Sequence, residues 1–285
     1  MTSAGAPAAQ VAVHGDAGEL ARAVAARLTA SVVDAQTARG SASVVLTGGR
    51  NGNAVLAALA TSPGRHGVDW SQLDVWWGDE RFEPDGDPER NVTQARETLL
   101  DGVPLEPSRV HAMAASDGAY GNDAEAAAEA YATELAAAAG AEGVAGAAGH
   151  GAVPSFDVLL LGVGPDTHVA SLFPGLSGVR ERERTVVAVR DAPKPPPVRL
   201  SLTLTAIRAA REVWLLAAGA DKADAVATAL APAASPDPAQ VPAAGAYGQE
   251  RTLWFLDEEA AARLPAEARP RPTRRKLKYG PFADS

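Results

Sequence analysis

Cysteine is absent from the 285 residues of the chain, and aromatic residues make up only 5%. The absence of cysteine excludes disulfides, thiolate nucleophiles and cysteine-bound metal sites. No uncharged apolar run reaches the roughly 18 residues that a membrane-spanning helix needs. The first residues lack a basic run followed by an apolar stretch, so we expect no signal peptide and a cytoplasmic protein.

Positive charge is also in deficit, because 26 Lys and Arg stand against 35 Asp and Glu, giving a net charge of −9. A general nucleic-acid binder neutralises phosphates over a broad surface, so this balance argues against that class. A small phosphorylated ligand needs only a local cluster of donors and stays compatible with the charge. The 46% hydrophobic and 21% charged residues are typical of a globular protein.

Short apolar runs alternate with segments of helical periodicity along most of the chain. Most of these runs are continuously apolar, which is typical of strands covered on both faces. The alternation predicts an α/β fold with a doubly wound, mostly parallel sheet and helices on both faces, in a Rossmann-like arrangement. The predicted strands are residues 43–47, 73–77, 156–163, 185–189, 213–217 and 252–256. The predicted helices include residues 20–32, a segment after the 51–53 cap region, residues 92–100, and segments after Asp123 and Asp221.

We expect one α/β domain over residues 1–264 and a basic, flexible tail over residues 265–285. Such a charge run is usually a solvated tail, and an interaction site for an acidic partner is the alternative. Within the domain, residues 140–153 are predicted to be a mobile loop and residues 231–242 an irregular connection. The tail cations are Arg269, Arg271, Arg274, Arg275, Lys276 and Lys278.

The first candidate site segment is the glycine-containing loop over residues 47–53, which follows a predicted strand. Ligands of doubly wound sheets bind beyond the carboxyl ends of the strands, so this is where a site is expected. Gly48 and Gly49 allow a sharp turn into a helix whose first amides can bind an anion. A plain tight turn is the alternative. The loop has neither the Lys-Ser/Thr pair of a Walker motif nor a dinucleotide fingerprint.

The second candidate is Asp79-Glu80-Arg81, which follows another predicted strand. The planar guanidinium of Arg81 matches phosphate oxygens, and Asp79 could hold it in place. A structural salt bridge at the rim of the sheet is the alternative. Asn91, at the start of a helix, is interpreted as an N-cap rather than a ligand group.

A short proline-rich run over residues 193–198 lies inside the domain. Such runs are usually linkers or partner ligands. Here the run is predicted to join a strand to a helix, and we interpret it as a rigid loop that presents Lys194 and Arg199.

The remaining candidate is the pair Asp166 and His168, which follows a Gly164-Pro165 turn at a predicted strand end. Imidazole can accept and return a proton near neutral pH, and the nearby carboxylate could orient it. No His and carboxylate cluster has ligand spacing, so no metal is expected. The other histidines are interpreted as lying in loops or at strand ends without acidic neighbours: His14, His66, His111 and His150.

In this order, the four segments resemble the 6-phosphogluconolactonase family, part of a wider group with glucosamine-6-phosphate deaminases, over about residues 44–256. The pattern Gly-x-Asp-Gly-His-Thr-Ala-Ser-Leu-Phe-Pro matches residues 164–174, with Thr167 in place of glycine and Val169 in place of threonine. The Asp-Glu-Arg-Phe pattern matches residues 79–82, and the Pro-Lys-Pro-Pro run with its following Arg-x-Ser lies within residues 193–201.

Two further stretches are informative, one because it differs from the deaminases and one because it differs from the usual pattern of the family. Residues 171–175, Ser-Leu-Phe-Pro-Gly, differ from the Asn-Glu-Pro-Gly ending typical of the deaminases. The first loop departs from the usual Ser-Gly-Gly-Ser-Thr-Pro, because Arg50 and Asn51 stand where hydroxyl side chains could bind phosphate. The contribution of this loop to phosphate binding would then come from backbone amides, Asn51 or Arg50, and only Gly48 and Gly49 are carried over from the family.

The resemblance implies hydrolysis of 6-phospho-D-glucono-1,5-lactone to 6-phosphogluconate, the second step of the oxidative pentose phosphate pathway. His168 would activate water and Asp166 would orient it, with a backbone amide near Gly164 as a candidate oxyanion donor. The implied partner is a small phosphorylated sugar lactone, with no cofactor, nucleic acid or membrane, in a monomer or small homo-oligomer. The implied substrate- or phosphate-binding residues are Gly48, Gly49, Asp79, Arg81, Lys194 and Arg199.

Two alternatives to the lactonase stay open. One is a glucosamine-6-phosphate deaminase or isomerase, which also uses a base and a phosphate pocket. The other is a sugar-phosphate-binding homologue that has lost catalysis.

Overall fold

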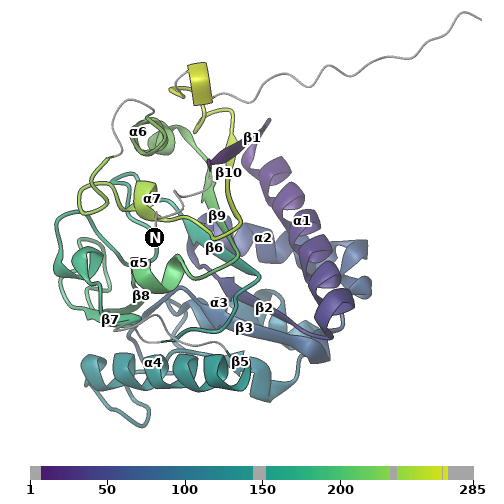
Figure 1. The fold of residues 1–285 in the computed structure, drawn as a ribbon, viewed down its shortest axis with the longest axis vertical. Helices are drawn as coiled ribbons and strands as arrows, with labels where there is room; N and C mark the ends of the chain where they lie inside the picture. The colour runs from purple at the N-terminus through teal and green to yellow at the C-terminus, as the bar shows by residue number, and fades with distance from the viewer. Residues whose placement is uncertain (1–7, 144–151, 232–235, 265, 269–285) are drawn as a thin grey trace, which may run out of the picture.

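Seven parallel strands form the central sheet of the computed structural model, which describes residues 8–143, 152–231, 236–264 and 266–268 (Figure 1). The strand order is β1-β10-β9-β6-β2-β3-β5. The doubly wound, mostly parallel α/β fold expected from the sequence is therefore confirmed. The strand bounds are β1 Gln10–His14, β2 Ala42–Leu46, β3 Leu73–Trp77, β5 Val110–His111, β6 Val158–Gly162, β9 Glu212–Ala217 and β10 Arg251–Asp257.

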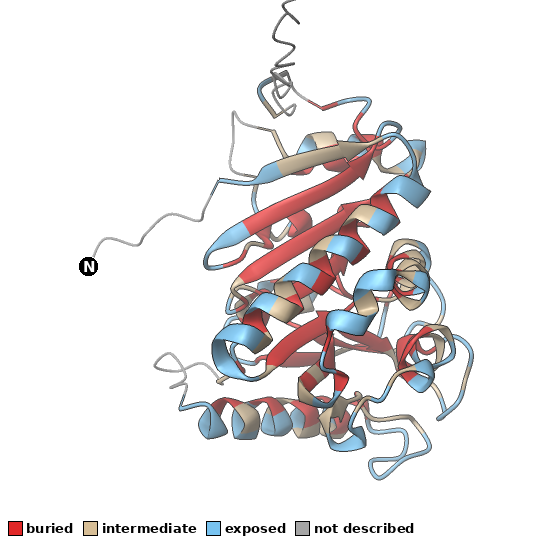
Figure 2. Ribbon diagram, turned by 90° about the vertical axis from the view of Figure 1, so that its right-hand side faces the viewer, coloured by how far each residue is buried: buried red, intermediate tan, exposed pale blue. Residues whose placement is uncertain are grey.

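Side chains along the strands alternate between two hydrophobic cores, one on each face of the sheet. In β6, Leu159 and Leu161 belong to one core, whereas Val158 and Leu160 belong to the other. Both faces are covered, so the inner strands are buried along most of their length, whereas the edge strands β1 and β5 are only partly buried (Figure 2). This burial explains why the apolar runs in the sequence are continuous rather than alternating.

The helices divide between the two faces (Figure 1). One core is closed by α1 Ala17–Arg39, α2 Gly49–Thr61 and α3 Asn91–Thr98. The other is closed by α4 Ala124–Ala141, α5 Leu204–Ile207, α6 Ala223–Ala229 and α7 Pro242–Gly245. In the described part of the chain, no helix combines the length and apolar character needed to cross a bilayer.

The direction of winding reverses between β2 and β6, which are neighbours in the sheet. From β2 the chain proceeds outward to β3 and β5, whereas from β6 it proceeds the opposite way to β9 and β10. The loops that follow β2 and β6 therefore diverge and leave a crevice at the carboxyl edge.

A second, antiparallel sheet of three strands lies beside the main one, in the order β4-β8-β7. Residues 185–189 were expected in the parallel sheet, but β7 Val186–Val189 belongs to this small sheet. The proline-rich run joins β7 to β8 Arg199–Leu202, so the expectation of a strand-to-helix connection was wrong. An apolar run indicates a strand but does not identify the sheet that it joins. The small sheet is completed by β4 Asp79–Arg81.

Several boundaries differ from the expectations. Helix α2 begins at Gly49, before the predicted cap region, and α7 begins within the predicted irregular connection. Helix α4 extends into the predicted mobile loop, of which residues 144–151 lie outside the described residues, as do residues 232–235 of the connection. The tail cations, all within residues 269–285, also lie outside them.

Candidate active site

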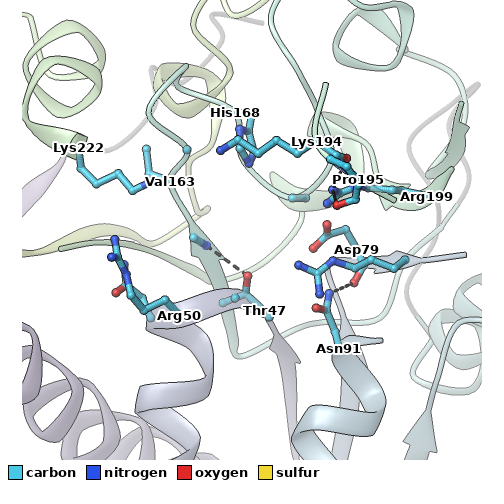
Figure 3. A pocket seen from close by; sticks show the side chains of 17 residues that line it. Thr47, Arg50, Asp79, Asn91, Val163, His168, Lys194, Pro195, Arg199 and Lys222 are labelled. Atoms are coloured by element: carbon cyan, nitrogen blue, oxygen red, sulfur yellow. Dashed lines mark hydrogen bonds between the residues drawn. The ribbon is translucent and has the colours of Figure 1, made fainter. Parts of the chain in front are cut away.

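A cavity of about 250 Å³ opens at the carboxyl edge of the sheet, between the loops that follow β2 and β6. Figure 3 shows side chains from both sides of the switch point converging on it. Asp166 is the predicted site residue outside the lining, and it contacts the cavity through His168. The predicted residues that line the cavity are Gly48, Gly49, Asp79, Arg81, His168, Lys194 and Arg199.

His168 and Asp166 form a hydrogen-bonded pair, with Nδ1 of the ring 2.5 Å from Oδ1 of the carboxylate. Burial raises the pKa of Asp166, but the hydrogen bond and charge of His168 outweigh it and lower the pKa to about 2. An ionised Asp166 accepts a hydrogen bond from Nδ1, so Nε2 is the ring nitrogen that stays available on the cavity side for proton exchange. The pair therefore has the arrangement of an oriented general base.

Two backbone features shape the loop that carries this pair. Gly164 is required, because a Cβ there would lie 2.0 Å from Nδ1 of His168 and 2.5 Å from Oδ1 of Asp166. Thr167 has a φ of 71°, a left-handed conformation that is unfavourable for a β-branched residue. The glycine that the family pattern has at this position would adopt this conformation without strain.

The amide of Gly164 is not an oxyanion donor in this structure. Its N–H donates to the carbonyl oxygen of His168 at 2.9 Å, and the N–H of Val163 donates to Leu216 at 3.1 Å. The backbone donor expected near Gly164 is therefore neither of these two amides, because the turn and the sheet already use them.

The loop after β2 leads directly into α2, with Gly48 as the N-cap and Gly49 at a φ of 73°. Gly48 is also sterically required, since a Cβ would lie 1.8 Å from Oδ1 of Asn91. No side chain caps this helix, and the N–H groups of a first helical turn have no intrahelical partner. The cavity therefore meets the positive end of a helix at this loop.

Lys222, which the sequence reasoning missed, lines the cavity close to this helix end (Figure 3). Burial lowers its pKa, and the charges of Lys194 and Arg50 lower it further, against the opposing effect of Asp221. Arg50 also lines the cavity, and its Nη2 donates to the carbonyl oxygen of Ala218 at 3.2 Å. Lys222 follows the end of β9, so the rule that directed attention to strand ends could have found it.

Arg81 and Arg199 belong to a second group of cations, on the small sheet. Nη1 of Arg81 donates to the carbonyl oxygen of Glu89 at 2.5 Å, and within the described residues Arg81 has no ion pair with Asp79. The expectation that Asp79 holds the guanidinium was therefore wrong. Arg199 is buried, which lowers its pKa, and its Nε and Nη2 donate to the carbonyl oxygens of Pro196 and Lys194. Arg199 thus fixes the loop that presents Lys194.

Asn91 has a different role from the one expected. It is the first residue of α3 rather than its N-cap, and its Nδ2 donates to the carbonyl oxygen of Asp79 at 2.7 Å. The buried carboxylate of Glu80 instead accepts the N–H groups of Asn91 and Val92, at 2.6 and 2.9 Å. Burial raises the pKa of Glu80, although the charge of Arg90 opposes this.

His111 was interpreted from the sequence as having no acidic neighbours, and the structure shows otherwise. His111 contacts two carboxylates, with Nδ1 2.6 Å from Glu134 and Nε2 3.2 Å from Asp74. It is stacked on Trp76 with a centroid distance of 3.7 Å and does not line the cavity. His150 lies outside the described residues. Across the ranges that the structure describes, no three His, Asp or Glu side chains form a group that could hold a metal ion.

The fold and the cavity together define a class of protein: an α/β protein with a hydrogen-bonded His–Asp pair and a cation-rich pocket at a topological switch point. The family model for "Glucosamine-6-phosphate isomerases/6-phosphogluconolactonase" matches residues 15–254. The chain belongs to this family.

Known relatives place the chain more narrowly within the family. It is 67% identical over 261 residues to the 6-phosphogluconolactonase of Streptomyces coelicolor, covering 92% of this chain and 97% of that protein. It is 50% identical to the 6-phosphogluconolactonase of Mycobacterium leprae, over 90% and 99% of the two chains. The structure of 6-phosphogluconolactonase from Trypanosoma brucei superimposes with a TM-score of 0.73 at 30% identity, over 90% and 99% of the chains. The chain is an enzyme, a hydrolase that acts on carboxylic esters.

Proposed function

We propose that the protein hydrolyses 6-phospho-D-glucono-1,5-lactone to 6-phosphogluconate, the second step of the oxidative pentose phosphate pathway. The observation that carries the proposal is His168, paired with Asp166, on the wall of a cavity that is also lined by two separate groups of cations. The names of the relatives support the same substrate.

The two groups of cations suit the two polar ends of this substrate. Lys222 and Arg50 lie beside the amides at the start of α2, whereas Arg81 and Arg199 lie on the small sheet. A helix N-terminus with adjacent cations is suited to a phosphate. We therefore propose that the phosphate binds beside Gly48 and Gly49, and that the lactone carbonyl lies toward the small sheet.

The phosphate is then held by several positive groups at once. The amides of Gly48 and Gly49 donate to its oxygens, and the ammonium of Lys222 neutralises its charge. Lys194, whose charge affects Lys222, closes over the phosphate from the proline-rich loop. The sequence interpretation placed Arg81 on the phosphate, and we propose instead that its fixed charge serves the lactone end.

Hydrolysis proceeds by general base catalysis without a covalent intermediate. Nε2 of His168 takes a proton from water while the water oxygen bonds to C1, and the carbonyl oxygen becomes an oxyanion. Arg81 stabilises this oxyanion. The oxyanion collapses, the bond between C1 and the ring oxygen breaks, and His168 returns its proton to that oxygen. Asp166 stabilises the imidazolium between these two transfers.

A comparison of two substrates tests this function. The protein should accelerate hydrolysis of the phosphorylated lactone above the spontaneous rate, with a much lower kcat/KM for gluconolactone without phosphate. Equal kcat/KM for both lactones contradicts the assigned phosphate site. Ammonia release from glucosamine 6-phosphate, without lactone hydrolysis, contradicts the proposed function and supports the deaminase alternative.

A further inference from the structure

Ser171, which begins the Ser-Leu-Phe-Pro stretch, does not line the cavity itself, but its side chain contacts Asp79, which does. The hydroxyl of Ser171 donates to Oδ2 of Asp79 at 2.6 Å, and the two residues are only 1% and 7% exposed. We propose that Ser171 is a positioning residue for the reaction, acting on the substrate through Asp79. This inference rests on the proposed function and adds to it a contact with the sugar ring.

Ser171 is fixed from its backbone side. Its N–H donates to Oγ of Ser201 at 3.1 Å, and that hydroxyl donates to the carbonyl oxygen of Leu202 at 3.0 Å. Ser201 is also the residue that pairs with Asp79 between β8 and β4. The loop carrying His168 is thereby attached to both strands, and the single hydroxyl proton of Ser171 is directed at Asp79.

The consequence for Asp79 is that its two carboxylate oxygens have different roles. Oδ2 accepts the proton of Ser171, whereas no described residue donates to Oδ1. Asp79 lines the cavity, and Figure 3 shows its carboxylate turned toward that space. With Oδ2 anchored, the carboxylate presents Oδ1 in a fixed direction.

The chemistry of Oδ1 identifies the group that it recognises. An ionised carboxylate only accepts hydrogen bonds, so it cannot bind a phosphate or a carbonyl oxygen. The sugar ring of the substrate provides donors, namely its hydroxyl groups. Asp79 therefore binds a ring hydroxyl, between the phosphate at one end and the reacting carbonyl at the other. A bond of this kind is present in both substrate and transition state, so its loss raises KM rather than lowering kcat.

A double-mutant cycle in the full-length protein tests whether Ser171 acts through Asp79. Ser171→Ala should raise KM for the phosphorylated lactone about tenfold or more and change kcat less than about twofold. Asp79→Asn should raise KM at least as much. The double variant should have the KM of Asp79→Asn alone, because the serine has no second route to the substrate.

Thr203→Ala is the matched control. Thr203 has a fully buried hydroxyl next to the same strand, which donates to the carbonyl oxygen of Arg184 at 2.8 Å and caps α5, and it does not line the cavity. Its loss should lower the free energy of unfolding and leave KM unchanged. If Ser171→Ala does not fold, Ser171→Cys keeps the size and a weaker donor and should raise KM by a smaller factor.

The outcomes separate the two claims. If the wild type hydrolyses the lactone but KM is unchanged in Ser171→Ala, the role of Ser171 is contradicted and the proposed function stands. Multiplicative effects of the two substitutions on KM likewise contradict action through Asp79. If the wild type has no lactonase activity, the proposed function fails and the inference fails with it.

Discussion

Gly164 lies against the imidazole of His168, so closely that a Cβ would be 2.0 Å from Nδ1. The same Cβ would be 2.5 Å from Oδ1 of Asp166, and both atoms belong to the hydrogen bond between the two side chains. The pair therefore exists in this geometry only because residue 164 has no side chain.

Gly164→Ala should separate the ring from the carboxylate and lower kcat by about 100-fold, because misoriented catalytic groups lose much of their effect. Steady-state kinetics on the phosphorylated lactone measure this. Gly140→Ala is the control, since a Cβ at this position in α4 meets nothing within 4 Å. It should keep kcat and gain about 0.5–1 kcal/mol of stability, as alanine is favoured over glycine in helices. Full activity of Gly164→Ala would contradict the assigned geometry.

Lys222→Met should raise KM for the phosphorylated lactone by about 10- to 100-fold, because a charged hydrogen bond to the phosphate is lost. Its KM for unphosphorylated gluconolactone should stay the same. Arg81→Gln is the contrasting variant and should mainly lower kcat, since Arg81 is assigned to the oxyanion. A rise in KM for Arg81→Gln with kcat unchanged would contradict the oxyanion role and indicate that Arg81 binds the phosphate.

Thr167 provides a test of backbone strain. Its φ of 71° favours glycine over any residue with a Cβ, and the strain is about 1–2 kcal/mol. Thr167→Gly should therefore have a higher free energy of unfolding than Thr167→Ala by about 1 kcal/mol, as measured in urea. Equal stability of the two variants would show that the conformation at this position carries no strain.

The raised pKa of His111 implies that the stability of the protein depends on pH. Burial lowers its pKa, but the hydrogen bonds and charges of Asp74 and Glu134 outweigh this and raise it above the ordinary value of 6.5. Protonated His111 therefore contributes stability that is fully present below pH 6.5 and is lost as the pH rises through the raised pKa. Urea unfolding across this range should show the loss, and His111→Gln should reduce it. An identical pH profile in the variant would contradict the ion pairs of His111.

Many residues that line the cavity were predictable, because ligands of this fold bind beyond the carboxyl ends of the strands. The strands β2, β3, β6, β9 and β10 were recognisable as continuous apolar runs, and the carboxyl-end rule then led to Gly48, Arg81 and His168. Other features depend on tertiary contacts. Lys222 lies between Asp221 and Asp224 and resembles an ordinary solvated helix start. Strand β8 begins with Arg199, a charged residue that would not be expected in a buried strand. It is buried here because its N–H groups donate to loop carbonyl oxygens.

The edge strands β1 and β5 were also missed, because both are only partly buried and β5 has only two residues. The link between Ser171 and Asp79 crosses 92 positions and could not be inferred from spacing. The sequence did single out the stretch that begins at Ser171, and the structure supplies a physical reason for a hydroxyl there.

The most direct test of the account is the hydrolysis of 6-phosphogluconolactone by His168→Gln, measured against the wild type and the spontaneous reaction. We expect kcat to fall by about 10²- to 10⁴-fold with KM nearly unchanged, since the general base is lost and the binding groups remain. Turnover of His168→Gln at the wild-type rate would contradict it.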